Sequence, residues 1–168
     1  MSKLKGKKKL NNAIAKELKP FGLTSAKLSN EFAFYPVSEV ITYKLTWDYQ
    51  DDWLNEFVKE RFNYDILYPF VFTLLHEIGH YLANDEIEGA ILEFCENEKE
   101  RIENEVKTAT DDYEKTLNWQ YFSLPDEIMA TQWAVNYSKT HPRKIKQMNE
   151  RINANIQEFY RKNEVIEG

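Results

Sequence analysis

Residues 68–82 read YPFVFTLLHEIGHYL and contain the longest apolar run of the chain. This run, residues 70–75, predicts a helix that is buried on most sides. Asp65 is expected as the N-cap, and Pro69 falls in the first turns, where a missing N–H group is tolerated. The sequence therefore predicts a central helix over residues 65–82 that carries polar residues into the core.

The polar residues of this helix form the pattern H-E-x-x-H, made of His76, Glu77 and His80. Residues four apart on a helix differ by only about 40° in direction, so both imidazoles project from one face and can share a metal ion. Glu77 lies beside them, within reach of a metal-bound water. Burying these polar side chains in an apolar helix costs free energy unless a partner compensates them, so the pattern predicts a metal site.

Zinc is the expected metal, because imidazole and carboxylate ligands suit it and catalytic zinc sites keep three protein ligands and a water. Glu127 is the preferred third ligand, since Ala130 and Ala134 on the same predicted helix would allow a close approach to the His helix. His141, just before Pro142, is the alternative third ligand.

Hydrophobic periodicity predicts further helices over residues 10–18, 51–62, 86–106, 125–139 and 143–160. Two short strands are expected over residues 32–35 and 37–47, where Thr, Val, Ile, Tyr and Phe are frequent. The predicted fold class is α+β and mostly helical, with a small N-terminal sheet. Residues 10–168 form one predicted domain, in which residues 84–118 are an insertion that carries an acidic helix.

Charge is distributed unevenly along the 168 residues, whose net charge is −6. Residues 1–27 carry +7, and we expect residues 1–9 to form a flexible basic arm. Residues 84–114 carry −9, which argues against nucleic-acid binding outside the arm and favours a basic protein partner. The single cysteine, Cys95, and the lack of a membrane-spanning apolar run predict a cytoplasmic protein.

Residues 68–82, followed by EIMATQWA at residues 127–134, resemble the ImmA/IrrE family of zinc metallopeptidases, which typically shows H-E-[IL]-G-H and then E-x-x-A-N-x-F-A. Thr131 replaces the usual Asn, Trp133 replaces the usual Phe, and 47 residues separate His80 from Glu127. The resemblance implies a zincin-like domain with the ligands His76, His80 and Glu127 and the general base Glu77. It also implies a bacterial, phage or mobile-element endopeptidase that acts on an intracellular regulator.

The expected function is therefore zinc-dependent hydrolysis of a peptide bond in a specific protein, such as a DNA-binding regulator. One alternative is a zinc-stabilised binding protein with little or no proteolytic activity that captures a basic partner. Another is a protease of the SprT type, which would use a third histidine. Several side chains are candidates for stabilising an oxyanion or for orienting the histidines: Tyr81, Tyr121, Tyr137 and His141 for the first role, and Asp85 and Asp126 for the second.

Overall fold

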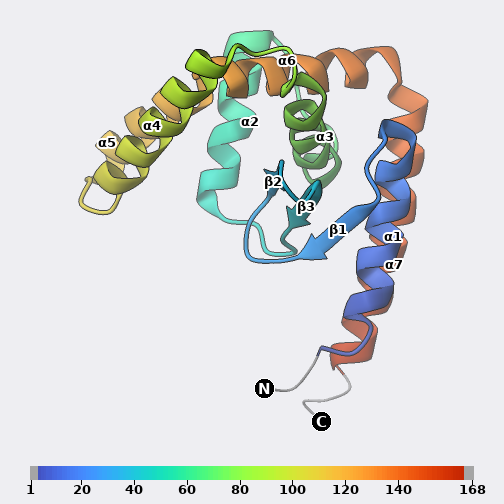
Figure 1. Cartoon of the computed structure of the whole chain (residues 1–168). Helices are drawn as coiled ribbons and strands as arrows, with labels where there is room; N and C mark the ends of the chain where they lie inside the picture. Colours follow the sequence, from blue (N-terminus) through green and yellow to red (C-terminus); the bar gives the residue numbers. More distant parts are fainter. Residues whose placement is uncertain (1–3, 165–168) are drawn as a thin grey trace.

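The computed structural model describes residues 4–164, which are mostly helical and include one three-stranded sheet (Figure 1). The predicted α+β class, mostly helical with a small N-terminal sheet, is confirmed at this level. Among the described residues, no helix combines the length and apolar character needed to cross a membrane. The elements in chain order are α1 (Lys7–Leu18), the short 3-10 helix η1 (Lys19–Phe21), β1 (Ser25–Leu28), β2 (Ala33–Tyr35), β3 (Val40–Tyr43), α2 (Tyr49–Phe62), α3 (Pro69–Ala83), α4 (Gly89–Val106), α5 (Asp111–Phe122), α6 (Pro125–Thr140) and α7 (Pro142–Glu164).

The central helix α3 is buried from Val71 to Gly79, as its apolar sequence predicts. The expected N-cap was wrong, because α3 begins at Pro69 rather than after Asp65. Proline disfavours helical backbone at the residue before it, and Tyr68 is accordingly extended, with φ −130° and ψ 86°. Asp65 instead pairs with Lys59 of α2.

The sheet has the strand order β1-β3-β2, with β3 parallel to β1 and antiparallel to β2. The two expected strands correspond to β2 and β3, but the parallel strand β1 was not predicted. Its sequence, SAKL, is short and has no run of β-branched residues, so its pairing with Val40–Tyr43 depends on tertiary contacts. The order leaves β2 at an edge of the sheet, near α3.

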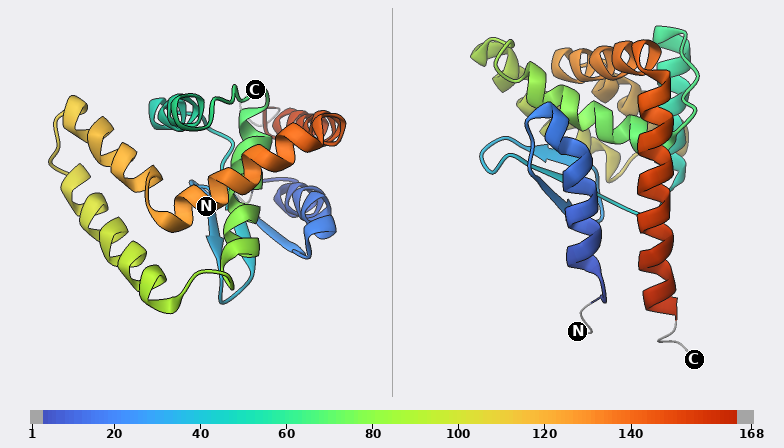
Figure 2. Two further views of the ribbon diagram at one scale, coloured as in Figure 1. Left: turned by 90° about the horizontal axis from the view of Figure 1, so that it is seen from above. Right: turned by 90° about the vertical axis from the view of Figure 1, so that its right-hand side faces the viewer.

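Helices α1 and α7 lie side by side (Figures 1 and 2), and the backbone of Lys5 and the side chain of Asn163 exchange hydrogen bonds. Ion pairs join them, from Lys9 to Glu158 and from Arg151 to Glu17. Lys7, Lys8 and Lys9, which we expected in a flexible arm over residues 1–9, form the first turn of α1. Residues 1–3 of that arm and residues 165–168 of the predicted domain lie outside the described residues.

The acidic segment, residues 84–118, contains α4 and most of α5, which pack together as a helical hairpin (Figure 2). One acidic helix was expected here, and the second helix of the hairpin was not predicted. The hairpin buries Cys95, Ile102 and Leu117. One side of α4 contacts α6, so the acidic segment is packed against the helix that carries Glu127.

Candidate metal centre

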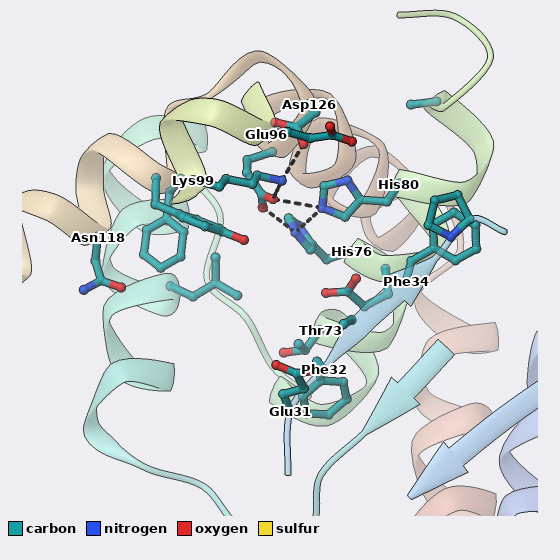
Figure 3. Close-up of a pocket in the computed structure, with 18 of the residues that line it drawn as sticks. Glu31, Phe32, Phe34, Thr73, His76, His80, Glu96, Lys99, Asn118 and Asp126 are labelled. Atoms are coloured by element: carbon teal, nitrogen blue, oxygen red, sulfur yellow. Dashed lines mark hydrogen bonds and ion pairs between the residues drawn. The ribbon is translucent and has the colours of Figure 1, made fainter. Parts of the chain in front are cut away.

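His76, His80 and Glu127 come together between α3 and α6, as the sequence predicted. His76 Nε2 lies 2.9 Å from Glu127 Oε2, and His80 Nε2 lies 3.2 Å from Glu127 Oε1. The two Nε2 atoms are 3.1 Å apart. In Figure 3 the two imidazoles point toward one another and toward the carboxylate between them and Lys99.

These separations fit a small divalent cation. Four ligands about 2.0–2.1 Å from zinc at tetrahedral corners are about 3.3 Å from one another. The Nε2 atoms of the two histidines, 3.1 Å apart, and the pair His76 Nε2 and Glu127 Oε2, 2.9 Å apart, lie close to that value, and one ligand atom from each of the three side chains falls within 4.8 Å of the others. The group can therefore hold a metal ion with little rearrangement, and a fourth corner can take water or substrate.

A glycine allows α3 and α6 to approach closely enough for this geometry. A Cβ at Gly79 would lie 2.6 Å from the carbonyl oxygen of Ala130 and 2.8 Å from its Cα. Gly79 lies between the two histidines on α3, and Ala130 is one turn after Glu127 on α6. The close contact between these two residues therefore brings the carboxylate of Glu127 within reach of both imidazoles.

Thr131 orients the first histidine. Its hydroxyl Oγ1 lies 3.1 Å from His76 Nδ1, and both side chains are buried. If Nδ1–H donates to this hydroxyl, the lone pair of Nε2 faces Glu127 and is available to a metal. Thr131 stands where the ImmA/IrrE pattern has Asn. In this chain its hydroxyl contacts His76 Nδ1, the ring nitrogen that does not face Glu127.

Glu77 is buried and lines the same cleft as the two histidines. Burial raises the pKa of Glu77, and the charge of Glu127 adds to the shift, while His80 and His76 oppose it. A carboxylate whose pKa is raised above its ordinary value is better suited to accept and return a proton.

The ligands are electrostatically matched to one another. Burial opposes ionisation of Glu127, but His80 and His76 hold its pKa well below the ordinary value. Burial also opposes the charged form of His80, but Glu127 and Glu77 raise the pKa of His80 to about 9. Glu127 is therefore ionised, and its negative charge beside two imidazole nitrogens favours the binding of a cation.

A lysine that the sequence analysis missed completes the site. Lys99 Nζ of α4 lies 2.6 Å from Glu127 Oε1, also donates to Asp126 Oδ2, and lies 5.2 Å from the ring centroid of Tyr121. Burial opposes its charge, but Glu127, Tyr121 and Asp126 raise the pKa of Lys99, so it remains an ammonium ion. No motif marks Lys99, because it belongs to a charged helix that resembles an ordinary solvated surface.

The cleft in front of the histidines has a volume of about 520 Å³. Its walls come from the edge strand β2 and its flanking residues, from α2 and α3, and from the α4–α5 hairpin. Figure 3 shows Glu31, Phe32 and Phe34 on one side of the histidines, and Asn118, Lys99 and Glu96 on the other.

The remaining sequence candidates divide into two groups. Tyr121 and Asp126 lie at the cleft, whereas the described part of the chain places Tyr81, Tyr137, His141 and Asp85 outside its lining. His141 stacks on Tyr137, with ring centroids 4.3 Å apart, and is not part of the metal-ligating group. His141 is therefore not the third ligand in this arrangement, because it caps the C-terminal end of α6, whereas Glu127 lies in the first turn of that helix.

Comparison of the chain with protein-family models, with curated proteins and with solved structures found no match in any of the three.

Proposed function

We propose that the chain is a zinc-dependent endopeptidase, with a zincin-like domain similar to that of the ImmA/IrrE peptidases. The observation that carries the proposal is one cleft that contains a His–His–Glu group, a buried Glu77 beside it and the edge of a sheet. Metal ligands alone are common in structural sites, but a structural zinc site is closed by four protein ligands. Here three ligands face a cleft.

The chemistry of the ligands favours zinc, since neutral imidazole and carboxylate bind it well and the separations suit tetrahedral coordination. Zinc bound there would lower the pKa of a coordinated water and polarise a carbonyl group. Glu77 would accept a proton from the attacking water and return it to the leaving amine. Tyr121 lines the same cleft, and its hydroxyl is the proposed donor to the charge that would develop on the carbonyl oxygen.

The edge strand favours a peptide as the substrate. Within residues 4–164, strand β2 pairs with β3 on one side only, and Ala33 and Phe34 of β2 line the cleft. An extended segment can add to such an edge through main-chain hydrogen bonds, which would hold its peptide groups in the cleft that the histidines line. The proposed substrate is therefore an extended, exposed segment of a protein.

The charge of the cleft favours a basic substrate, such as a DNA-binding regulator. Glu31 and Glu96 stand on opposite walls of the cleft (Figure 3). Other acids of the hairpin serve different contacts, since Glu98 and Glu105 pair with Arg101. A negative field at the cleft raises the local concentration of cationic segments.

The test is zinc-loaded Glu77→Gln compared with the wild-type protein on an unbiased peptide library, with cleavage read by mass spectrometry. We expect the variant to retain zinc and to lose about 10²–10⁴-fold in rate, because the amide cannot accept the proton. Glu60→Gln, at an exposed position of α2, is the matched control.

Undiminished cleavage by Glu77→Gln would exclude Glu77 as the base. Absence of cleavage by the zinc-loaded wild-type protein, together with capture of basic peptides, would instead identify a zinc-stabilised binding protein.

A further inference from the structure

Lys99 reaches the metal-ligating group from outside it. It projects from the acidic hairpin, and its ammonium group contacts Glu127 Oε1 at 2.6 Å. The same ammonium group donates to Asp126 Oδ2, and the ring of Tyr121 lies 5.2 Å away. The lysine side chain is mostly buried, so these contacts are not those of a solvated surface pair.

The two oxygens of Glu127 are therefore not equivalent. Oε2 lies 2.9 Å from His76 Nε2, whereas Oε1 lies 3.2 Å from His80 Nε2 and 2.6 Å from Lys99 Nζ. A carboxylate with both oxygens free can bind a metal through either one or both. The ammonium group of Lys99 occupies Oε1 as an ion-pair partner, so Oε2 is the oxygen that remains available to a metal.

Charge balance allows Lys99 and a metal ion to be present together. Three buried carboxylates surround the site, those of Glu77, Asp126 and Glu127. When all three are ionised, a divalent cation and one ammonium group neutralise them. Asp126 can thus hold Lys99 beside Glu127 against the repulsion of the metal.

We propose that Lys99 is a positioning residue that restricts Glu127 to one metal-binding oxygen and so keeps a coordination position open for water or substrate. The inference rests on the proposed metal centre. It assigns a role to the acidic hairpin as well, because the hairpin supplies the group that sets the coordination of the metal.

The test uses Co²⁺ alone as the probe, since its visible absorption weakens as its coordination number rises above four. In Lys99→Met both oxygens of Glu127 become available. We expect weaker visible absorption per bound Co²⁺. We also expect Zn²⁺ affinity to rise by about tenfold, the scale on which outer partners of metal ligands act, because a neighbouring positive charge is removed.

Two variants serve as controls. Lys99→Arg restores a cation at the same place and should return both readouts to wild-type values. Lys115→Met removes the lysine of the neighbouring helix α5, which likewise pairs with a glutamate, Glu56, and lies 5.2 Å from the ring centroid of Trp119. It should leave both readouts unchanged.

Folding of Lys99→Met is at risk, because Asp126 Oδ1 is already buried and without a hydrogen-bond partner among residues 4–164. Lys99→Met combined with Asp126→Asn removes that buried charge, and its Co²⁺ spectrum should still show the loss of absorption. An unchanged spectrum in the folded variant, or a fall in the Zn²⁺ affinity of Lys99→Met, would overturn the role of Lys99. Failure of the wild-type protein to bind either ion would instead overturn the metal centre.

Discussion

Gly79→Ala tests whether the contact between α3 and α6 builds the site. The added Cβ would meet Ala130 O at 2.6 Å and Ala130 Cα at 2.8 Å, about 0.8 Å inside the 3.4 Å at which ordinary contact begins. Both atoms belong to the backbone, so no side-chain rotation can relieve the overlap. The two helices must move apart by a comparable distance.

The expected cost follows from two opposing effects. Overpacking of a core contact costs about 1–3 kcal/mol, and the immovable backbone places this site near the upper end. The higher helix propensity of alanine returns about 1 kcal/mol. We therefore expect a net loss of about 2 kcal/mol in the free energy of unfolding of the metal-free protein.

The loss of metal affinity should be larger than the loss of stability suggests. Metal–ligand distances tolerate about 0.2 Å, and a displacement of several tenths of an ångström would take Glu127 out of reach of a metal held by His76 and His80. We expect at least a tenfold fall in Zn²⁺ affinity, the size of effect seen when a hydrogen-bond partner that orients a metal ligand is removed.

The assay is denaturant unfolding of the metal-free protein together with Zn²⁺ competition against a chelator. Gly89→Ala is the control, because a Cβ at that helical glycine meets nothing within 4 Å. It should leave Zn²⁺ affinity unchanged and should not lower the free energy of unfolding, which the helix propensity of alanine can raise by up to about 1 kcal/mol. A Gly79→Ala protein that unfolds and binds Zn²⁺ like the wild type would refute the argument that this contact positions Glu127.

Three further predictions concern the outer partner of His76, the protonation of His80 and the walls of the cleft. Thr131→Val removes the hydroxyl at His76 Nδ1 and should weaken Zn²⁺ binding by about 10–100-fold, while Thr131→Ser retains it; equal affinities in the two variants would contradict this role. The pKa of His80 is raised from 6.5 to about 9, so its proton stabilises the metal-free fold fully below about pH 6.5, and that stability is lost as the pH rises through about 9. The melting temperature of the metal-free wild-type protein should therefore fall across this pH interval relative to that of His80→Gln. Zn²⁺ affinity should rise over the same interval, because the metal must displace the proton of His80. A melting-temperature difference that does not change with pH would be inconsistent with the raised pKa. Glu31→Gln combined with Glu96→Gln should raise KM for basic peptides at low salt and make cleavage less dependent on salt, and an unchanged salt dependence would show that these carboxylates do not attract the substrate.

The fold class and the histidine pair could be predicted because they depend on local geometry. Helical periodicity places His76 and His80 on one face of α3 whatever surrounds it, and the apolar residues before them require burial. The position of Glu127 near the histidines could also be predicted. The small residues one and two turns later, Ala130 and Ala134, suggested a close helix contact, and both are buried.

Strand β1, the helix α5 and the role of Lys99 could not be predicted, because each depends on contacts between distant segments. The sequence SAKL pairs with β3 only once the chain between them has folded back. Lys99 belongs to a helix in which charged residues alternate, and nothing local separates it from Arg101, which stays at the exposed surface with Glu98 and Glu105.

Local periodicity, which is readable from the sequence, specified most of the helices and brought His76 and His80 to one face of α3. The tertiary structure alone decided how close α3 and α6 come at Gly79, which oxygen of Glu127 faces His76, and that the acidic hairpin turns one ammonium group into the site. The physical reason is that hydrogen-bonding periodicity is a property of a single segment, whereas the approach of two backbones and the pairing of buried charges are properties of the packed chain.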